Sequence, residues 1–293
     1  MNGPALRVNL PMNEPRSAPR TTPLLAAHLP DAQALSAALN WPYRIEDWQL
    51  ALELGHGIAV EAEGHLVATA LWWSYEDQFA TCGMIIVNPA WQRRGIGAAV
   101  MDELLRQSAG RTMLLCSTRE GRRLYETLGF LPFGQVHQHQ AVLLDRPAES
   151  TADATRRFEA SDWGALCEVD RLATGMGRER LLRALVASSE CRVIEQQGAV
   201  SGYAMLRRWG RGYVIGPVAA RSVTDARALI AAHLASQVGR FVRIDVTAAC
   251  GLSGWLEQIG LTRVDEVTLM VRGQRPATDA HTSLFALANQ SFG

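Results

Sequence analysis

The sequence predicts an α/β (α+β) protein made of two similar units joined in tandem. Three observations support this prediction. The chain has 293 residues, and folded domains average about 150 residues. Apolar residues make up 48% of the sequence, which is ample for two hydrophobic cores. The order of helix-like and strand-like segments in the first half also recurs in the second half.

The first unit is expected to span residues 21–146, after a proline-rich, flexible lead-in over residues 1–20 that has little to bury. Apolar spacing predicts two helices and then a hairpin, in residues 31–39, 44–54, 57–61 and 65–73. A buried strand over residues 79–87 follows. A helix starts near Gly97, because apolar residues recur at helical spacing at positions 100, 101, 104 and 105.

The turn between this strand and this helix is the most informative stretch of the chain. Gly95 and Gly97 lie at the helix start, where the first backbone N–H groups have no acceptor within the helix. The helix dipole adds about half a positive charge there, and glycines let a phosphate approach the bare backbone. Arg93 and Arg94 add formal charge. The turn therefore predicts an anion cradle, with a tight connection bearing solvated arginines as the alternative.

Two further motifs follow, a strand over residues 111–116 and a short helix that ends at Gly129. With them, the chain resembles the GNAT superfamily of acetyl-CoA-dependent N-acetyltransferases over roughly residues 20–145. Gln92, Gly95 and Gly97 fill the family signature Gln/Arg-x-x-Gly-x-Gly/Ala. The run Leu124-Tyr125 followed by Gly129-Phe130 matches the later Leu-Tyr-x-x-x-Gly-Phe element.

This resemblance implies two tandem GNAT folds, each a mixed, mostly antiparallel sheet flanked by helices, with acetyl-CoA as acyl donor and no metal. The family often carries Asn six or seven residues before the tyrosine, whereas this chain has Ser117-Thr118, of which Thr118 still offers a hydroxyl to a pantetheine amide. The resemblance assigns cofactor contacts to Ile85, Ile86, Val87, Gln92, Arg93, Arg94, Gly95, Ile96, Gly97, Ala98 and Thr118.

The resemblance also implies catalytic roles. Tyr125 is expected to protonate the leaving thiolate, because a phenol with an ordinary pKa near 10 suits that donation. The alternative is a helix residue that packs its ring and leaves its hydroxyl at the surface. Asp77 is the candidate general base and Glu76 a candidate substrate contact, both at the mouth of the central strand. Both acids could instead be solvated turn residues, with the amine losing its proton to water.

The second unit is expected to span residues 156–293, after a linker over residues 147–155. An ungapped shift of 131 residues superposes Val87 on Val218 and Gly129 on Gly260. The same shift replaces four functional positions, so that Arg94, Gly95, Gly97 and Tyr125 become Asp225, Ala226, Ala228 and Leu256. These changes predict a degenerate copy, as in tandem members of the family. Chance similarity between two α/β segments is the alternative.

The second unit is also expected to contribute to the substrate site. Asp170 and Arg180 flank the loop at residues 173–177, which resembles the substrate-side loop of the tandem group. An acid there could hold a cationic amine. An exposed ion pair at a helix end is the alternative.

Composition excludes several functional classes. The 29 basic and 29 acidic residues balance, so the chain lacks the positive charge of a nucleic-acid binder. No apolar run approaches the roughly 20 residues that span a bilayer. The five cysteines are odd in number and widely spaced, which predicts thiols in a reducing cytoplasm and neither disulfides nor a metal site.

The sequence therefore predicts a cytoplasmic enzyme, monomer or homodimer, that acetylates the primary amine of a small metabolite in its N-terminal unit. Two alternatives remain at this point. The protein could be a non-catalytic acyl-CoA sensor or assembly module, or it could acetylate amines of peptides or proteins.

Overall fold

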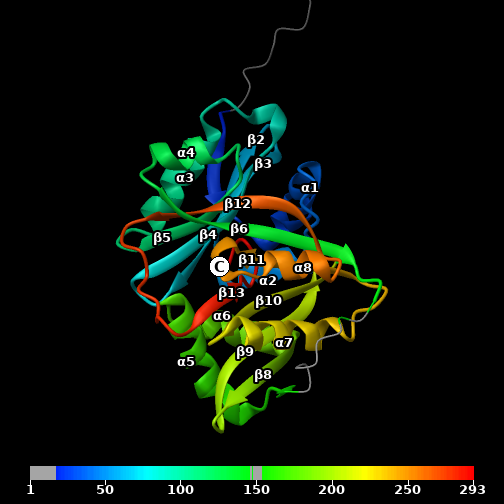
Figure 1. Ribbon diagram of the computed structural model, residues 1–293. Coiled ribbons are helices and arrows are strands. Elements are labelled where there is room, and N and C mark those ends of the chain that lie inside the picture. Colours follow the sequence, from blue (N-terminus) through cyan, green and yellow to red (C-terminus); the bar gives the residue numbers. More distant parts are fainter. Residues whose placement is uncertain (1–17, 146, 148–153) are drawn as a thin grey trace, which may run out of the picture.

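The computed structural model describes residues 18–145, 147 and 154–293, so most of the expected lead-in and linker lies outside the described residues. The first half contains helices on both sides of a series of strands (Figure 1). Its elements are β1 Arg20–Pro23, α1 Leu29–Ala38, α2 Ile45–Leu54, β2 His56–Ala62, β3 His65–Tyr75, β4 Phe79–Val87, α3 Ile96–Gln107, β5 Thr112–Ser117, α4 Arg122–Thr127 and β6 Leu131–Val142.

The second half repeats this order and then adds one strand. Its elements are β7 Thr155–Arg157, α5 Trp163–Thr174, α6 Glu179–Ser188, β8 Glu190–Gln196, β9 Ala199–Trp209, β10 Gly212–Ala220, α7 Val223–Leu234, β11 Phe241–Thr247, α8 Ser253–Gln258, β12 Thr262–Arg272 and β13 Ser283–Ala286. The predicted internal repeat is therefore present. The additional strand, β13, has no counterpart in the first half.

The strands of the described residues form one sheet in the order β1-β2-β3-β4-β5-β12-β6-β11-β13-β10-β9-β8-β7. Antiparallel pairing predominates, whereas β4 with β5 and β10 with β11 run parallel. The expected mixed, mostly antiparallel sheet is confirmed. The sheets of the two units are continuous with one another, because the two series of strands join into one sheet.

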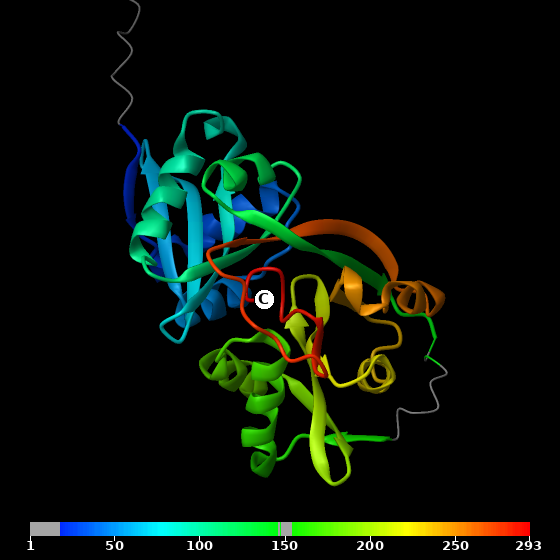
Figure 2. The ribbon, with the colours of Figure 1, turned by 60° about the vertical axis from the view of Figure 1, so that its left-hand side comes forward.

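The two halves merge by exchanging their last strands. The strand β12 from the second half lies between β5 and β6, and β6 from the first half lies between β12 and β11. Figure 2 shows β6 and β12 running together across the middle of the molecule. Val136 of β6 faces Val267 of β12 in this ladder, and both side chains are buried. Each half thus completes its sheet with a strand of the other.

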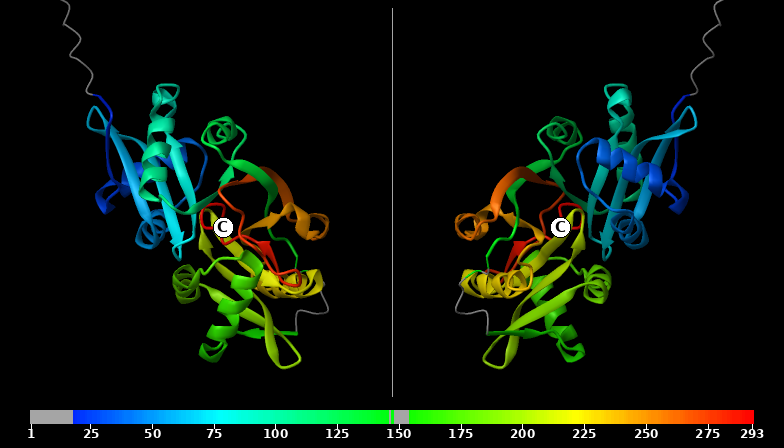
Figure 3. Two further views of the ribbon diagram at one scale, coloured as in Figure 1. Left: turned by 90° about the vertical axis from the view of Figure 1, so that its left-hand side faces the viewer. Right: turned by 90° about the vertical axis from the view of Figure 1, so that its right-hand side faces the viewer.

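A shared hydrophobic core joins the inner faces of the two halves. Helices α1 and α2 contribute to it from one side, and α5 and α6 from the other. The ring of Tyr43 in the first half meets Trp209 in the second edge to face, with centroids 5.5 Å apart. Helix α3 lies on the opposite face of the first sheet and α7 packs over β9 and β10. Figure 3 shows the two halves from the side, with the exchanged strands between them.

The strand exchange predicts that the two halves unfold together. Replacing Val136 by Ala should lower the free energy of unfolding by roughly 1–3 kcal/mol, because a fully buried side chain at the junction is truncated. Val142→Ala on the same strand is the control, since Val142 is 52% exposed. Thermal unfolding followed by circular dichroism should show one transition, shifted only in Val136→Ala. Two separate transitions, or equal shifts in both variants, would contradict the exchange.

Candidate functional site

The first half has an opening in its sheet where β4 and β5 separate. Their parallel pairing runs from Phe79–Thr112 to Cys82–Leu115 and then stops. Two residues later, Met84 has a φ of 50°, a left-handed backbone conformation that bends the strand. The carbonyl of Met84 accepts a hydrogen bond from Thr69 Oγ1 on β3 at 2.9 Å, which fixes this bend. Residues 83–87 are consequently unpaired on their β5 side.

An anion cradle lies at the end of β4. Eight residues, 88–95, connect β4 to α3. Gly95 has a φ of 81° at the helix start, and no side chain caps this helix. The first N–H bonded within this turn belongs to Ala99 and donates to Gly95 O. Among the described residues, the N–H groups of Ile96, Gly97 and Ala98 have no backbone acceptor, so they are available to an anion.

One glutamine and two arginines surround this cradle, and the two arginines are free to bind an anion. Gln92 donates from its side-chain amide to the carbonyl of Val87 at 3.1 Å, which closes the turn. The guanidinium of Arg94 lies 4.8 Å from the ring centroid of Trp91. Arg93 and Arg94 are exposed, and neither has a carboxylate within 4 Å among the described residues. The predicted cradle residues are therefore brought together, with Ile85, Ile86 and Val87 on the adjoining unpaired edge.

Tyr125 lies close to the point where the strands separate. It is on α4, only 8% exposed, and belongs to the same hydrophobic cluster as Cys82 and Leu115, the last residues paired between β4 and β5. Burial raises the pKa of its phenol well above the ordinary value, and the neighbouring Cys82 thiol adds to this effect. No hydrogen bond of its hydroxyl is found among the described residues. The raised pKa therefore keeps the phenol protonated at neutral pH, and its hydroxyl can still donate a hydrogen bond to a ligand.

Thr118 occupies the turn between β5 and α4. Its Oγ1 accepts a hydrogen bond from the Gly121 N–H at 3.3 Å, so the hydroxyl helps to shape the start of the helix that carries Tyr125. The side chain is half-buried. Thr118 directly follows the last residue of β5, Ser117.

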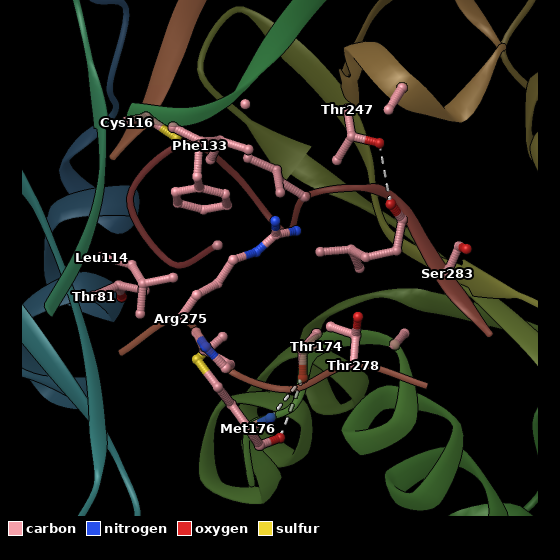
Figure 4. Close-up of a pocket in the computed structure, with 18 of the residues that line it drawn as sticks. Thr81, Leu114, Cys116, Phe133, Thr174, Met176, Thr247, Arg275, Thr278 and Ser283 are labelled. Atoms are coloured by element: carbon pink, nitrogen blue, oxygen red, sulfur yellow. Dashed lines mark hydrogen bonds between the residues drawn. The ribbon is translucent and has the colours of Figure 1, made fainter. Parts of the chain in front are cut away.

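A cavity of about 320 Å³ lies between the halves (Figure 4). Thr81 of β4 and Leu114, Leu115 and Cys116 of β5 form one wall. The other walls come from β6, the α5–α6 loop, the end of β11 and residues 275–293. Leu114 and Cys116 alternate along β5 with Met113 and Leu115, which pack in the cluster of Tyr125. Leu115 borders the cavity as well, but Leu114 and Cys116 pack in other clusters, so most of the cavity lies on the side of the sheet opposite Tyr125.

The last residues of the described chain line this cavity and are firmly held. A Cβ atom added to Gly83 would come within 2.6 Å of Ser291 Oγ, so the tail lies directly against β4 beside the strand separation. Tyr75 Oη donates to the carbonyl of Phe292 at 2.6 Å. Arg178 Nη1 donates to the carbonyl oxygen of Gly293 at 2.7 Å. The position of the tail is thus fixed by both halves.

Two charged side chains, Arg275 and Asp279, line the cavity. The N–H of His281 donates to the Asp279 carboxylate at 2.8 Å and holds its pKa below its ordinary value. Burial raises the pKa of the Cys116 thiol, so this lining cysteine is protonated and is not a thiolate nucleophile. Neither Arg275 nor Asp279 was expected from the sequence, because both lie in an irregular segment without a motif.

The two acids expected at the mouth of the central strand lie in the turn between β3 and β4, directly before that strand. The Asp77 side chain is fully exposed and stands 3.8 Å from the Arg111 guanidinium. Glu76 is exposed too. Its carboxylate packs directly against Gly177, because a Cβ atom added to this glycine would collide with Glu76 Oε1. Neither residue lines the cavity. The structure places them in the solvated turn, as the alternative interpretation had it.

Asp170 and Arg180 also differ in placement from the expectation. The Asp170 carboxylate is fully buried and accepts from Arg178 Nη2 at 2.7 Å, from Arg178 Nε at 3.0 Å and from the Tyr203 hydroxyl. Arg180 donates to the backbone carbonyl of Glu53 at 2.7 Å. The loop between them does line the cavity, through Ala173, Thr174 and Met176. The two residues that flank the loop bond to other parts of the protein and do not line the cavity.

The second half lacks the cradle. Two residues, 221 and 222, connect β10 to α7, in place of eight in the first half. Ser222 caps α7 by accepting from the Asp225 N–H at 3.1 Å, and Gln196 donates to the Asp225 carboxylate at 2.8 Å. The shift of 131 residues matches α4 with α8 and β6 with β12 but is wrong here, because the shorter connection places Ser222, and not Ala226, opposite Gly95.

The second half also lacks the opening in the sheet. Pairing between β10 and β11 stops at Ile215–Ile244, at the position equivalent to the separation in the first half. The additional strand β13 enters this gap and pairs with both neighbours, since Ala286 faces Val218 and Val246. In α8, Leu256 takes the place of Tyr125 and is fully buried. At these equivalent positions, the described residues of the second half offer neither an unpaired strand edge nor a phenol.

Comparison with known proteins agrees with this geometry. Two family models, both described as an acetyltransferase (GNAT) domain, match residues 53–132 and 166–286. The chain belongs to the GNAT acetyltransferases. An uncharacterized N-acetyltransferase of Bacillus subtilis, YitH, is 26% identical over 271 residues, which cover 91% of this chain and 95% of the relative.

Solved structures show the same tandem fold. A putative acetyltransferase from Pyrococcus horikoshii aligns with a TM-score of 0.80 and 20% identity, over 96% of this chain and 99% of that chain. A tandem GNAT protein from the clavulanic acid biosynthesis pathway aligns with a TM-score of 0.57 and 12% identity, over 89% of this chain and all of that chain. The predicted tandem GNAT architecture and acetyltransferase class are confirmed.

GNAT domains use acetyl-CoA as acyl donor, and the residues of the first half fit that donor. Free N–H groups and two arginines surround the place where a pyrophosphate would bind, and the unpaired β4 edge offers backbone partners to an amide chain. Within the described residues, no group of three or more His, Cys, Asp or Glu side chains is arranged to hold a metal ion. No helix in the described part of the chain is long and apolar enough to cross a bilayer.

The asymmetry between the halves predicts one coenzyme A site per chain. Gly97→Glu should abolish binding measured by calorimetry, because a carboxylate in the cradle repels the pyrophosphate. Gly97→Ala should fold normally, since a Cβ there comes no closer than 3.5 Å to its nearest neighbour, Leu124 Cδ2, and it separates the effect of a methyl group from that of a negative charge. Asp225→Asn should leave binding unchanged. Two equivalent sites, or normal binding by Gly97→Glu, would contradict the assignment.

Proposed function

We propose that the first half, with residues 21–146 as its domain, transfers acetyl from acetyl-CoA to the primary amine of a small metabolite. The observation that carries this proposal is the separation of β4 and β5 beyond Cys82 and Leu115. The anion cradle and Tyr125 lie on one side of that separation, and the cavity lies on the other. Donor and acceptor can therefore approach from opposite faces of the sheet.

The reaction requires a proton near the leaving sulfur. When bound, acetyl-CoA supplies a thioester, and transfer to an amine forms a C–N bond, breaks the C–S bond and moves one proton from nitrogen to sulfur. Tyr125 holds a proton at Oη beside the strand separation, and its raised pKa keeps it there at neutral pH. We assign the donation of this proton to Tyr125.

The amine must also lose a proton before it can react. Asp77 and Glu76 lie outside the cavity, and Asp279 is a weak base because its pKa is lowered. We therefore propose that the amine enters in its neutral form after losing its proton to water. The second half, proposed as residues 156–293, then serves to build the walls of the acceptor cavity.

The cavity favours a small acceptor over a peptide. Its volume of about 320 Å³ is at the small end of ligand pockets. Residues of both halves line it as one compact, partly open pocket, whereas a peptide substrate would need an extended groove. The alternative of a non-catalytic acyl-CoA sensor does not account for an uncommitted, buried phenol at the strand separation.

Tyr125→Phe tests the catalytic role of the phenol. Acetylation of a panel of small amines, followed by thiol release, should fall about 100-fold or more, because the leaving sulfur loses its proton donor. Binding of coenzyme A by calorimetry should stay within about twofold. Tyr213→Phe, far from the cavity, is the matched control. Tight donor binding without turnover of any amine would favour the sensor instead.

The pH dependence tests how the amine is deprotonated. With two acceptor amines of different pKa, kcat/KM should rise with pH and follow the pKa of each amine. Ionisation of Tyr125 should cause no loss of activity below about pH 10, because burial raises its pKa above the ordinary phenol value. A single apparent pKa shared by all amines would show a general base on the protein and refute this part of the proposal.

A further inference from the structure

Among the described residues that line the acceptor cavity, Arg275 is the one cationic side chain, and it stands at the exposed end of the cavity lining. It belongs to the segment between β12 and β13, and Figure 4 shows its guanidinium group directed into the cavity. The guanidinium carbon lies 4.8 Å from the ring centroid of Phe133, another lining residue. This contact with a ring fixes the direction of a long and otherwise flexible side chain.

The guanidinium of Arg275 has no anionic partner within the described residues. No carboxylate lies within 4 Å of it, and none of its N–H donors makes a hydrogen bond in the described part of the chain. Buried arginines differ from it: Arg178 and Arg243 are paired with Asp170 and Asp245, and Arg207 donates to two backbone carbonyls. Asp279, the other charged lining residue, is satisfied by the N–H of His281. Arg275 therefore presents unused donors to whatever enters the cavity.

The chemistry of these donors selects a class of ligand. A guanidinium is planar, stays charged at all physiological pH values and matches the two oxygens of a carboxylate or phosphate. A guanidinium that rests against an aromatic ring also loses less conformational entropy on binding than a free side chain. A second positive charge in the ligand would be repelled at this position.

We propose that the acceptor is an amine that also carries an oxyanion, a carboxylate or a phosphate, and that Arg275 binds this anion while the amine points toward the strand separation. This inference rests on the proposed acetyltransferase function and specifies its substrate class. It separates amino-acid-like acceptors from polyamines, both of which fit the cavity by size. Asp170, which was expected to hold a cationic amine, and Glu76, the other acidic candidate for a substrate contact, lie outside the cavity, in agreement with this assignment.

Matched amines test the anion requirement. The panel contains ω-amino carboxylates of increasing length, the carboxamide of each, O-phosphoethanolamine with ethanolamine, and putrescine. In thiol-release assays, the wild-type protein should prefer at least one anionic amine to its neutral partner by roughly 10- to 100-fold in kcat/KM, the effect of a charge-assisted contact. The carboxylate and phosphate arms identify which oxyanion is bound. Equal rates for charged and neutral partners, or a preference for putrescine, would overturn the proposal.

Substitutions assign the preference to Arg275. Arg275→Met should remove the preference by slowing the anionic amine and sparing its neutral partner, and Arg275→Glu should favour putrescine. Arg221→Met is the matched control, since Arg221 is exposed and lies outside the cavity. A preference that persists in Arg275→Met would refute the assignment to this residue.

A binding measurement separates this inference from the proposed function. If coenzyme A binds but no amine is turned over, the acetyltransferase proposal fails and the anion site is tested alone. Calorimetric titration of the coenzyme A complex with the N-acetylated form of each panel member should then show binding of anionic members to wild type and not to Arg275→Met. Absence of binding to wild type, or equal binding to both proteins, would overturn the anion site.

Discussion

The divergence of two parallel strands is the constraint on which the rest of this molecule depends. Where β4 leaves β5 after the Cys82–Leu115 pair, backbone groups on the facing edges lose their ladder partners. Unpaired backbone groups inside a protein need other partners. The first half leaves its groups for a ligand, whereas the second half fills the equivalent gap with β13. The same fold thus occurs twice, once with an unpaired strand edge between its parallel strands and once with that edge paired to β13.

The filled gap explains why two similar halves can divide their roles. The strand β13 belongs to the same final segment that lines the acceptor cavity and lies against Gly83. The segment that closes the second half therefore also forms a wall of the site in the first. Exchange of β6 and β12 fixes the two halves relative to one another, so a cavity with walls from both can keep its shape.

Local structure was predicted well from the sequence and long-range pairing was not. The strand, glycine turn and helix around Gly95 have their own propensities and lie close together in the chain, so their pattern is readable. The sequence of a strand such as β6 can show which side chains alternate between the two faces, but it does not show which other strand the backbone pairs with. The exchange with β12 therefore could not be predicted.

Charged residues were predicted least well, for a physical reason. Asp170 is an acid of the kind that could bind an amine. In the folded protein it is buried, and its carboxylate pairs with Arg178 and accepts a hydrogen bond from Tyr203. Arg275 stands in an irregular segment that no periodicity describes, and only the folded chain brings it against Phe133. Likewise, the shift that aligned Tyr125 with Leu256 was correct, while its extension to the glycine turn was not, because the second half has lost six residues of that connection.

A crystal structure of the protein with coenzyme A tests the central claim most directly. The account predicts the diphosphate on the N–H groups of Ile96, Gly97 and Ala98 and the pantetheine chain between β4 and β5. It also predicts that β13 remains between β10 and β11. Coenzyme A bound between β10 and β11, or a β4–β5 separation closed by side chains, would contradict it.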